Sequence, residues 1–203
     1  MKTNLLTIVF LALLNTVLQA QPKERGFIIS EDKTLNESEL EAFHEIAEQR
    51  VSEFQQYLKI ISSKQSASKD KDDAGESALK LFIPNAKIDI TYKKNNVILR
   101  NTSYPIGDYF SRLRALTYAK VEITFFSLSY VGKFTKGKDG KYYASATIFQ
   151  EFTGFDIEGK IKYTDKQMKT IDLIMEYKYD QFYDEWQWTV LLGDIKAIDT
   201  PVE

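Results

Sequence analysis

The sequence predicts an α+β fold, in which a long N-terminal helix and two shorter helices pack on a strongly curved, mostly antiparallel sheet. Three observations lead to this class. An apolar stripe recurs at helical spacing over residues 40–61. The second half of the chain holds long segments of branched and aromatic residues, divided by short turn-like sequences. The 203 residues include 12 Tyr and 13 Phe, which favour strands.

Residues 1–20 have the order of a cleavable signal peptide. Lys2 gives a basic start, an apolar run follows, and Ala20 places a small residue before the expected cut at Gln21. The apolar run is short for a bilayer span, which needs about 20 residues. We therefore expect an exported protein, periplasmic or secreted, with no membrane span after cleavage. A lead-in segment over 21–35 and one domain over 36–199 should follow.

The mature chain is slightly acidic and has no cysteine. The net charge is −2, and removal of Lys2 with the leader makes it −3. This balance argues against a nucleic-acid partner, because nucleic acids require a basic surface. Without cysteine there is no disulfide, no thiol nucleophile and no cysteine metal site. With a single histidine, His44, there is no paired-histidine metal motif, so we expect no metal and no cofactor.

Helix signals begin at Asn36 or Ser38, either of which can cap the first helix. The stripe of this helix is Leu40, Phe43, Ile46, Ala47, Val51, Phe54, Leu58 and Ile61. Residues 62–76 have almost nothing to bury and predict a mobile loop. The aspartates of this segment lack the ligand spacing of a calcium loop. A short helix is expected over Ser77–Phe82, and a third helix should open at Pro105 and Ile106.

The strands are predicted from alternation and from turn residues. A small hairpin is expected from Ala86–Tyr92 and Val97–Leu99, joined at Asn95 and Asn96. The residues between the second and third of the longer strands, 156–167, are expected to form a loop. The longer strands themselves are expected over Val121–Phe134, Tyr142–Phe155, Met168–Tyr179 and Trp186–Ile198.

This order of elements resembles the NTF2-like, cystatin-related superfamily over about residues 35–198. The resemblance is carried by the segments Ile106–Phe110, Gln150–Gly154 and Trp188–Ile195. The chain is also similar in pattern to exported NTF2-like proteins of Bacteroidetes. The resemblance implies a cone in which the curved sheet wraps the first helix around an internal pocket. It also implies that homodimers through the outer sheet face are common.

Asp194 is a candidate acid or base. Strand alternation without a bulge would put it on the apolar face of Trp188, Val190 and Leu192, where burial raises the pKa of a carboxyl. The alternative, which we favour, is that Gly193 marks a bulge. Asp194 then turns outward or accepts backbone N–H bonds. His44 is interpreted as a residue at the edge of the first helix.

Three further residues are candidate ligand contacts. Gln150 interrupts the apolar face of a central strand beside small alanines, where it can orient a ligand or bond a neighbouring helix. Tyr109 and Trp188 can stack on a planar ligand, although aromatic residues at such spacing usually pack in a core. Residues 177–188 hold more aromatic side chains than one face of a strand pair can cover, so some should be exposed or meet a partner.

Two functions follow from these features. The first is a non-enzymatic exported domain that binds a small apolar or aromatic ligand in the cone, or a protein partner such as a second copy through the sheet. The alternative is a small pocket enzyme of the ketosteroid-isomerase-like or dehydratase-like kind, with Asp194 as acid or base. No paired acid and base can be assigned from the sequence, which favours the first reading.

Overall fold

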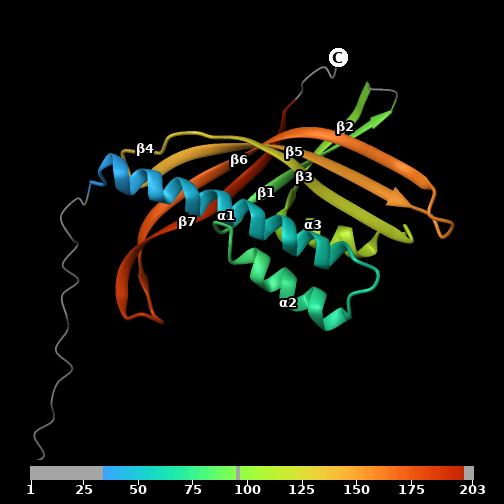
Figure 1. Ribbon diagram of the computed structural model, residues 1–203, viewed down its shortest axis with the longest axis horizontal. Coiled ribbons are helices and arrows are strands. Elements are labelled where there is room, and N and C mark those ends of the chain that lie inside the picture. The colour runs from blue at the N-terminus through green and yellow to red at the C-terminus, as the bar shows by residue number, and fades with distance from the viewer. Residues whose placement is uncertain (1–33, 95–96, 199–203) are drawn as a thin grey trace, which may run out of the picture. The chain divides into compact units, whose positions relative to one another are not determined.

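The computed structural model describes the backbone of residues 34–94 and 97–198. The expected signal peptide, most of the lead-in segment and the turn at Asn95 and Asn96 lie outside these residues. From Thr34 onward the chain forms one unit of three helices and a seven-stranded sheet. Figure 1 shows the long strands bending across α1, so the predicted α+β class is confirmed. The arrangement agrees with the cone that the resemblance implies.

Helix α1 spans Glu37–Ser62 and starts at the cap that the sequence predicts. The Asn36 side chain accepts the N–H of Glu39 at 3.0 Å, and the Glu39 carboxylate accepts the N–H of Asn36 at 2.9 Å. This reciprocal pair is a capping box, which satisfies two backbone donors at the helix start. The C-terminal half of the predicted stripe is fully buried, whereas Leu40, Phe43 and Ile46 are partly buried. The stripe faces the sheet and fixes the position of the helix.

Helix α2 spans Ser68–Leu79, so the loop predicted over 62–76 is wrong for its second half. Ala74 and Ala78 of this helix are buried, and α2 lies against α1 and α3. The Lys69 ammonium pairs with Asp73 at 2.7 Å along the helix. A polar sequence therefore forms a helix because two alanines suffice to pack it on a neighbour. Its aspartates lie on a helix and not in the loop that the sequence predicts.

The sheet has the strand order β2-β1-β7-β6-β5-β3 and is antiparallel except between β1 and β7. The short strand β4, Thr135–Lys136, pairs with the start of β5. The other strands are β1 Lys87–Lys94, β2 Val97–Pro105, β3 Lys120–Val131, β5 Tyr142–Phe155, β6 Ile161–Asp180 and β7 Glu185–Ile198. Register shifts interrupt both the β3–β5 and β6–β7 pairs. Such bulges bend strands and account for part of the sheet's curvature.

Strand β6 begins at Ile161, so the loop predicted over 156–167 is wrong from that residue on. Strand β5 needs a partner of similar length, and residues 161–167 supply it by pairing with residues 150–155. Strand β2 is likewise longer than the predicted Val97–Leu99 and runs directly into α3, Ile106–Ala115. Among the described helices, none is long and apolar enough to cross a membrane.

Candidate functional site

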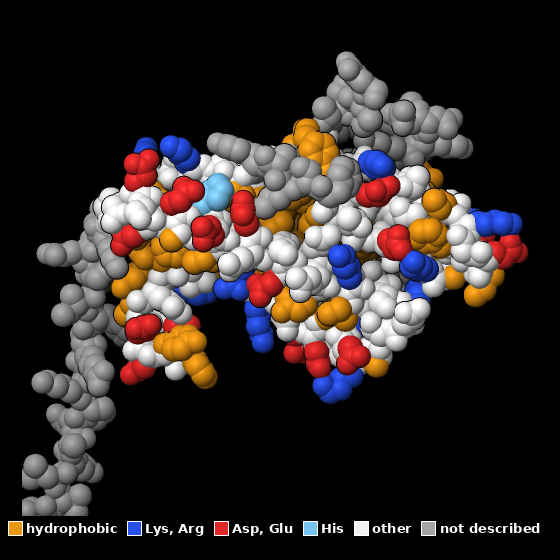
Figure 2. All heavy atoms as spheres, in the orientation of Figure 1, with side chains coloured by type: hydrophobic (Ala, Val, Ile, Leu, Met, Phe, Trp, Pro, Cys, Tyr) orange, Lys and Arg blue, Asp and Glu red, His pale blue; other side chains and the backbone are white. Residues whose placement is uncertain are grey.

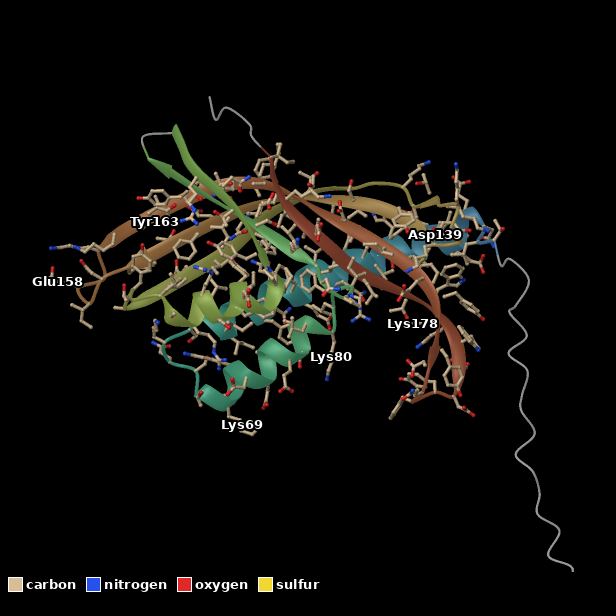
Figure 3. All side chains as sticks on the ribbon, turned by 180° about the vertical axis from the view of Figure 1, so that it is seen from behind. Lys69, Lys80, Asp139, Glu158, Tyr163 and Lys178 are labelled. Atoms are coloured by element: carbon tan, nitrogen blue, oxygen red, sulfur yellow. The ribbon has the colours of Figure 1, made fainter. Side chains whose placement is uncertain are left out.

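A pocket of about 460 Å³ lies between α3 and the part of the sheet made by β1, β5 and β6. Its volume falls within the range of small-molecule sites. Tyr163 marks this half of the sheet in Figure 3, at the end opposite to Asp139 and Lys178. The side chains that line the pocket come from four elements and from the segment after α3, because the sheet bends over the helix.

The walls of the pocket are mostly aromatic. The rings of Tyr92 and Tyr163 stack with centroids 6.2 Å apart and planes 8° from parallel. Phe152 meets Tyr163 edge-on at 5.8 Å and Tyr118 edge-on at 6.1 Å. Tyr118 lies against Gly154, where an added Cβ would come within 2.7 Å of the ring. The glycine thus lets one wall of the pocket approach the strand closely.

Polar residues form the base of the pocket, on the concave face of β5 and β6. The strand register places Gln150 opposite Gln167, and Lys169 opposite Ile148. Both glutamines are nearly buried, with 8% and 9% of their surfaces exposed, and Lys169 is 3% exposed. Buried polar groups require hydrogen-bond partners, so the contacts of these three residues decide what the site can hold.

Gln167 bridges from β6 to β1. Its Nε2 donates to the carbonyl oxygen of Thr91 at 2.7 Å and also to Asp165. These two bonds fix the orientation of the amide, because a flipped amide would set two oxygens against each other. Its Oε1 is buried and has no partner among the described residues. A bound molecule that donates a hydrogen would satisfy this oxygen.

Lys169 makes the second bridge to β1. Its Nζ donates to the carbonyl oxygen of Asp89 at 2.6 Å. Burial lowers the pKa of Lys169 to about 8, while the negative charges of Asp165 and Asp89 act in the opposite direction. An ammonium group has three donors. At neutral pH this side chain is therefore mainly a cation that needs acceptors beyond the Asp89 carbonyl.

Tyr109 comes from α3 and closes the pocket from the helix side. Burial raises the pKa of its hydroxyl well above the ordinary value, and a hydrogen bond with the Gln150 side chain acts in the opposite direction. Tyr109 therefore stays neutral and can donate a hydrogen bond at physiological pH. The predicted third helix, with Tyr109 in its buried stripe, is what brings this hydroxyl to the sheet.

Exposed residues form the mouth of the pocket. They are Tyr92, Arg112 and Lys162. The Arg112 guanidinium carbon lies 4.0 Å from the ring centroid of Tyr104, a cation–π contact that restrains it. Lys162 pairs with Asp156 at 3.3 Å. Together with Lys169, the lining carries three basic side chains and one carboxylate, that of Asp165.

Two of the four predicted contact residues line this pocket, Tyr109 and Gln150. Trp188 packs instead against Tyr142 and Tyr177, at 5.4 Å and 5.3 Å between ring centroids. Asp194 does not line the pocket either. Its Oδ1 accepts the backbone N–H of Lys87 at 2.9 Å, at the start of β1.

The β6–β7 register explains the position of Asp194. Ile171 pairs with Ile195 and Leu173 with Leu192, so Gly193 and Asp194 together face Asp172. This is the bulge that the sequence offered as the favoured alternative. His44 is partly buried on α1, with its Nε2 3.7 Å from Glu48. Among the described residues, no group of three acidic or histidine side chains is placed to hold a metal.

The end of the β6–β7 hairpin carries exposed aromatic side chains, as the sequence predicts for residues 177–188. Phe182 is 86% exposed, and Tyr183 and Trp186 are also largely exposed. Figures 1 and 2 show this end projecting from the body, with carboxylates beside the hydrophobic side chains. Pairing of two copies through the sheet stays a prediction.

Sequence reasoning missed Asp165, Gln167 and Lys169, which form much of the polar base. They fell in or beside the predicted loop over 156–167. A signal was present, since Ile171, Leu173 and Met175 alternate toward the core. Extending that alternation backward puts Lys169, Gln167 and Asp165 on the same concave face.

No protein-family model matches the sequence, and a search of the curated proteins finds no match. Among solved structures, the chain is similar to an epoxide hydrolase/cyclase-like enzyme, SalBIII, described for its role in pyran ring formation in the polyether salinomycin. The two chains are 17% identical, and the match covers 75% of this chain and 98% of the other. The TM-score is 0.24, and a likeness of this size carries no argument about the function.

Proposed function

We propose that the protein is a binding domain that holds a small, planar, largely apolar molecule between α3 and the curved sheet. One observation carries this proposal: the cavity of about 460 Å³ has aromatic walls and a small set of buried polar groups at its base. Apolar walls supply affinity, whereas a few fixed donors and acceptors orient a ligand. The proposal keeps the ligand class predicted from the sequence and moves the site away from Trp188 and Asp194.

The proposal is tested with N-phenyl-1-naphthylamine, a neutral aromatic probe whose fluorescence rises in apolar surroundings. We expect wild-type protein to bind it with saturation, and Phe152→Ala to bind it about fivefold more weakly, because a ring contact contributes about 1 kcal/mol. The matched control is Phe182→Ala, which removes a phenyl ring from the exposed end of the β6–β7 hairpin. Its affinity should equal that of wild type.

Far-ultraviolet circular dichroism should show that both variants are folded. Absence of saturable binding by wild type would contradict the proposal. So would an equal affinity of the Phe152 and Phe182 variants, since the probe would then bind outside the aromatic walls.

A small pocket enzyme is the second candidate, and one observation favours it. The amine of Lys169, with its pKa lowered to about 8, shares the pocket with the neutral hydroxyl of Tyr109. A base and a donor of this kind suit removal of a proton next to a carbonyl group. Asp194 has no part in this version, because it does not line the pocket.

This second candidate predicts exchange of the α-hydrogens of 2-tetralone, a planar ketone, in deuterated buffer. If the pocket is catalytic, wild type should exchange them faster than buffer alone, and Lys169→Met should reduce the rate to background, as followed by proton NMR. Exchange at the buffer rate in the presence of wild type would leave the binding function as the only one proposed. Lys166→Met, on the opposite face of β6, is the matched control.

A further inference from the structure

We propose that the ligand is a planar aromatic acid and that its carboxylate pairs with Lys169 at the base of the pocket. This inference rests on the binding function proposed above and adds the chemical class of the ligand. Two observations on the positive charge of the pocket support it, one at the base and one at the mouth.

The first observation is that Lys169 is a buried cation without a carboxylate partner. It is 3% exposed, and no ion pair joins it to any acidic side chain in the described part of the chain. Its one acceptor there is the carbonyl of Asp89. Asp165, the nearest acid along the same face of β6, already accepts from Gln167. Buried charges are normally paired, because an unpaired one loses its hydration without compensation.

A bound carboxylate would provide the missing partner. Its two oxygens can accept the remaining ammonium hydrogens, and charge-assisted bonds of this kind are stronger than neutral ones. The contact between Lys169 and the Asp89 carbonyl holds the amine in place before a ligand arrives. A neutral ligand would leave the buried charge uncompensated, so the site should discriminate between an acid and its amide.

The second observation is the charge at the mouth of the pocket. Arg112 is exposed, is restrained on the ring of Tyr104, and has no ion pair among the residues that the structure describes. Lys162 also lines the pocket, but it pairs with Asp156, so Arg112 gives the entrance its excess positive charge on a protein that is acidic overall. Such a local field attracts anions and raises their rate of association. The mouth and the base of the pocket therefore favour the same sign of ligand charge.

The test compares 2-naphthoate with 2-naphthamide by isothermal titration calorimetry at pH 7 and low salt. The two molecules have nearly the same shape and differ in charge. We expect wild type to bind the acid about 10- to 100-fold more tightly than the amide, as one charge-assisted contact predicts. Lys169→Met keeps the length of the side chain but removes the charge, and it should abolish this preference. Lys166 lies on the opposite face of the sheet, where it pairs with Glu151 of β5, so Lys166→Met should keep the preference for the acid.

A second measurement uses wild type alone, so that it does not depend on the variant folding. Affinity for 2-naphthoate should fall as the pH rises through about 8, because Lys169 then loses its charge. Near pH 8 and just above it, binding should be accompanied by proton uptake, because the bound carboxylate restores the proton on Lys169, and this is seen as a binding enthalpy that depends on the buffer. The other titratable or charged groups that face Lys169 or the pocket are the carboxylates of Asp165 and Asp89, the bases Arg112 and Lys162, and the hydroxyls of Tyr92, Tyr109, Tyr118 and Tyr163.

Burial raises the pKa of Tyr163 to about 12 and raises that of Tyr109 as well, so neither ionises between pH 7 and 9. Equal affinities for acid and amide, unchanged in Lys169→Met, would overturn the inference and leave the binding function standing. If wild type binds neither naphthalene compound nor the neutral probe, the proposed function fails as well. An acid preference that survives in Lys169→Met would also overturn the assignment of Lys169 and move the contact to Arg112.

Discussion

Replacement of Phe54 by alanine is expected to lower the free energy of unfolding by about 3–5 kcal/mol, the cost of removing a phenyl ring from a closed core. Phe54 is 1% exposed and lies where α1 meets the sheet and the other helices. Its ring centroid is 5.0 Å from that of Phe82, 6.4 Å from Phe110 and 6.0 Å from Phe125. Four segments therefore meet at this ring, and no single neighbour can move to fill the space.

Urea unfolding followed by circular dichroism would measure this effect. Phe182→Ala is the control, because Phe182 is 86% exposed, and we expect a change within about 0.5 kcal/mol. A loss of less than about 1 kcal/mol for Phe54→Ala would contradict the packing described for α1, since a buried phenyl ring would then contribute no more than a surface residue. The effect should appear in the midpoint of unfolding and not in the slope.

Helix α1 and strand β5 could be predicted because one face of each is at least partly buried from end to end. The α1 stripe ends at Ile61, close to the end of the helix at Ser62, and β5 has the predicted bounds Tyr142–Phe155. In both cases apolar residues recur at the period of the element. Local periodicity is sufficient when burial runs from one end of an element to the other.

Helix α2 and the first part of β6 could not be predicted in the same way, because their neighbours decide their structure. Helix α2 buries only Ala74 and Ala78. Two alanines barely change the polar composition of this segment, so the composition predicts a loop. Residues 161–167 carry polar side chains on both faces and have no apolar alternation, and β5 holds them in the sheet through its backbone. Tertiary contact overrides weak local preference in both segments.

Some residues of the candidate site could be predicted and others could not, again because neighbouring strands decide part of the structure. Strand alternation places Gln150 correctly, and the stripe of α3 places Tyr109 correctly. Uninterrupted alternation would misplace Asp194, because the bulge at Gly193, which the sequence analysis favours, adds a residue to the strand. Lys169 was missed because lysine side chains are usually exposed. Only the path of β1 shows that the Asp89 carbonyl accepts a hydrogen bond from its ammonium group.

The free energy of unfolding should rise with pH between about 8 and 10, because the folded protein loses the buried charge of Lys169 over this range. Its pKa is about 8 in the folded protein and about 10.4 in an unfolded chain. Between these values the unfolded chain binds the proton and the folded protein does not, so raising the pH favours folding. The full difference corresponds to about 3 kcal/mol, of which about 2 kcal/mol falls between pH 7 and 9.5.

Lys169→Met isolates this effect. At pH 7 the variant should be more stable than wild type by about 1–2 kcal/mol, because the gain from removing a buried charge exceeds the loss of the bond to the Asp89 carbonyl. The raised pKa values of Tyr109 and Tyr163 lower stability above about pH 10 in both proteins, so they cancel in the comparison. Urea midpoints from pH 7 to 9.5 should therefore converge as wild type gains stability. Parallel midpoints across this range would show that the Lys169 amine is hydrated in the folded protein. The pocket would then hold no uncompensated charge for an acid to neutralise.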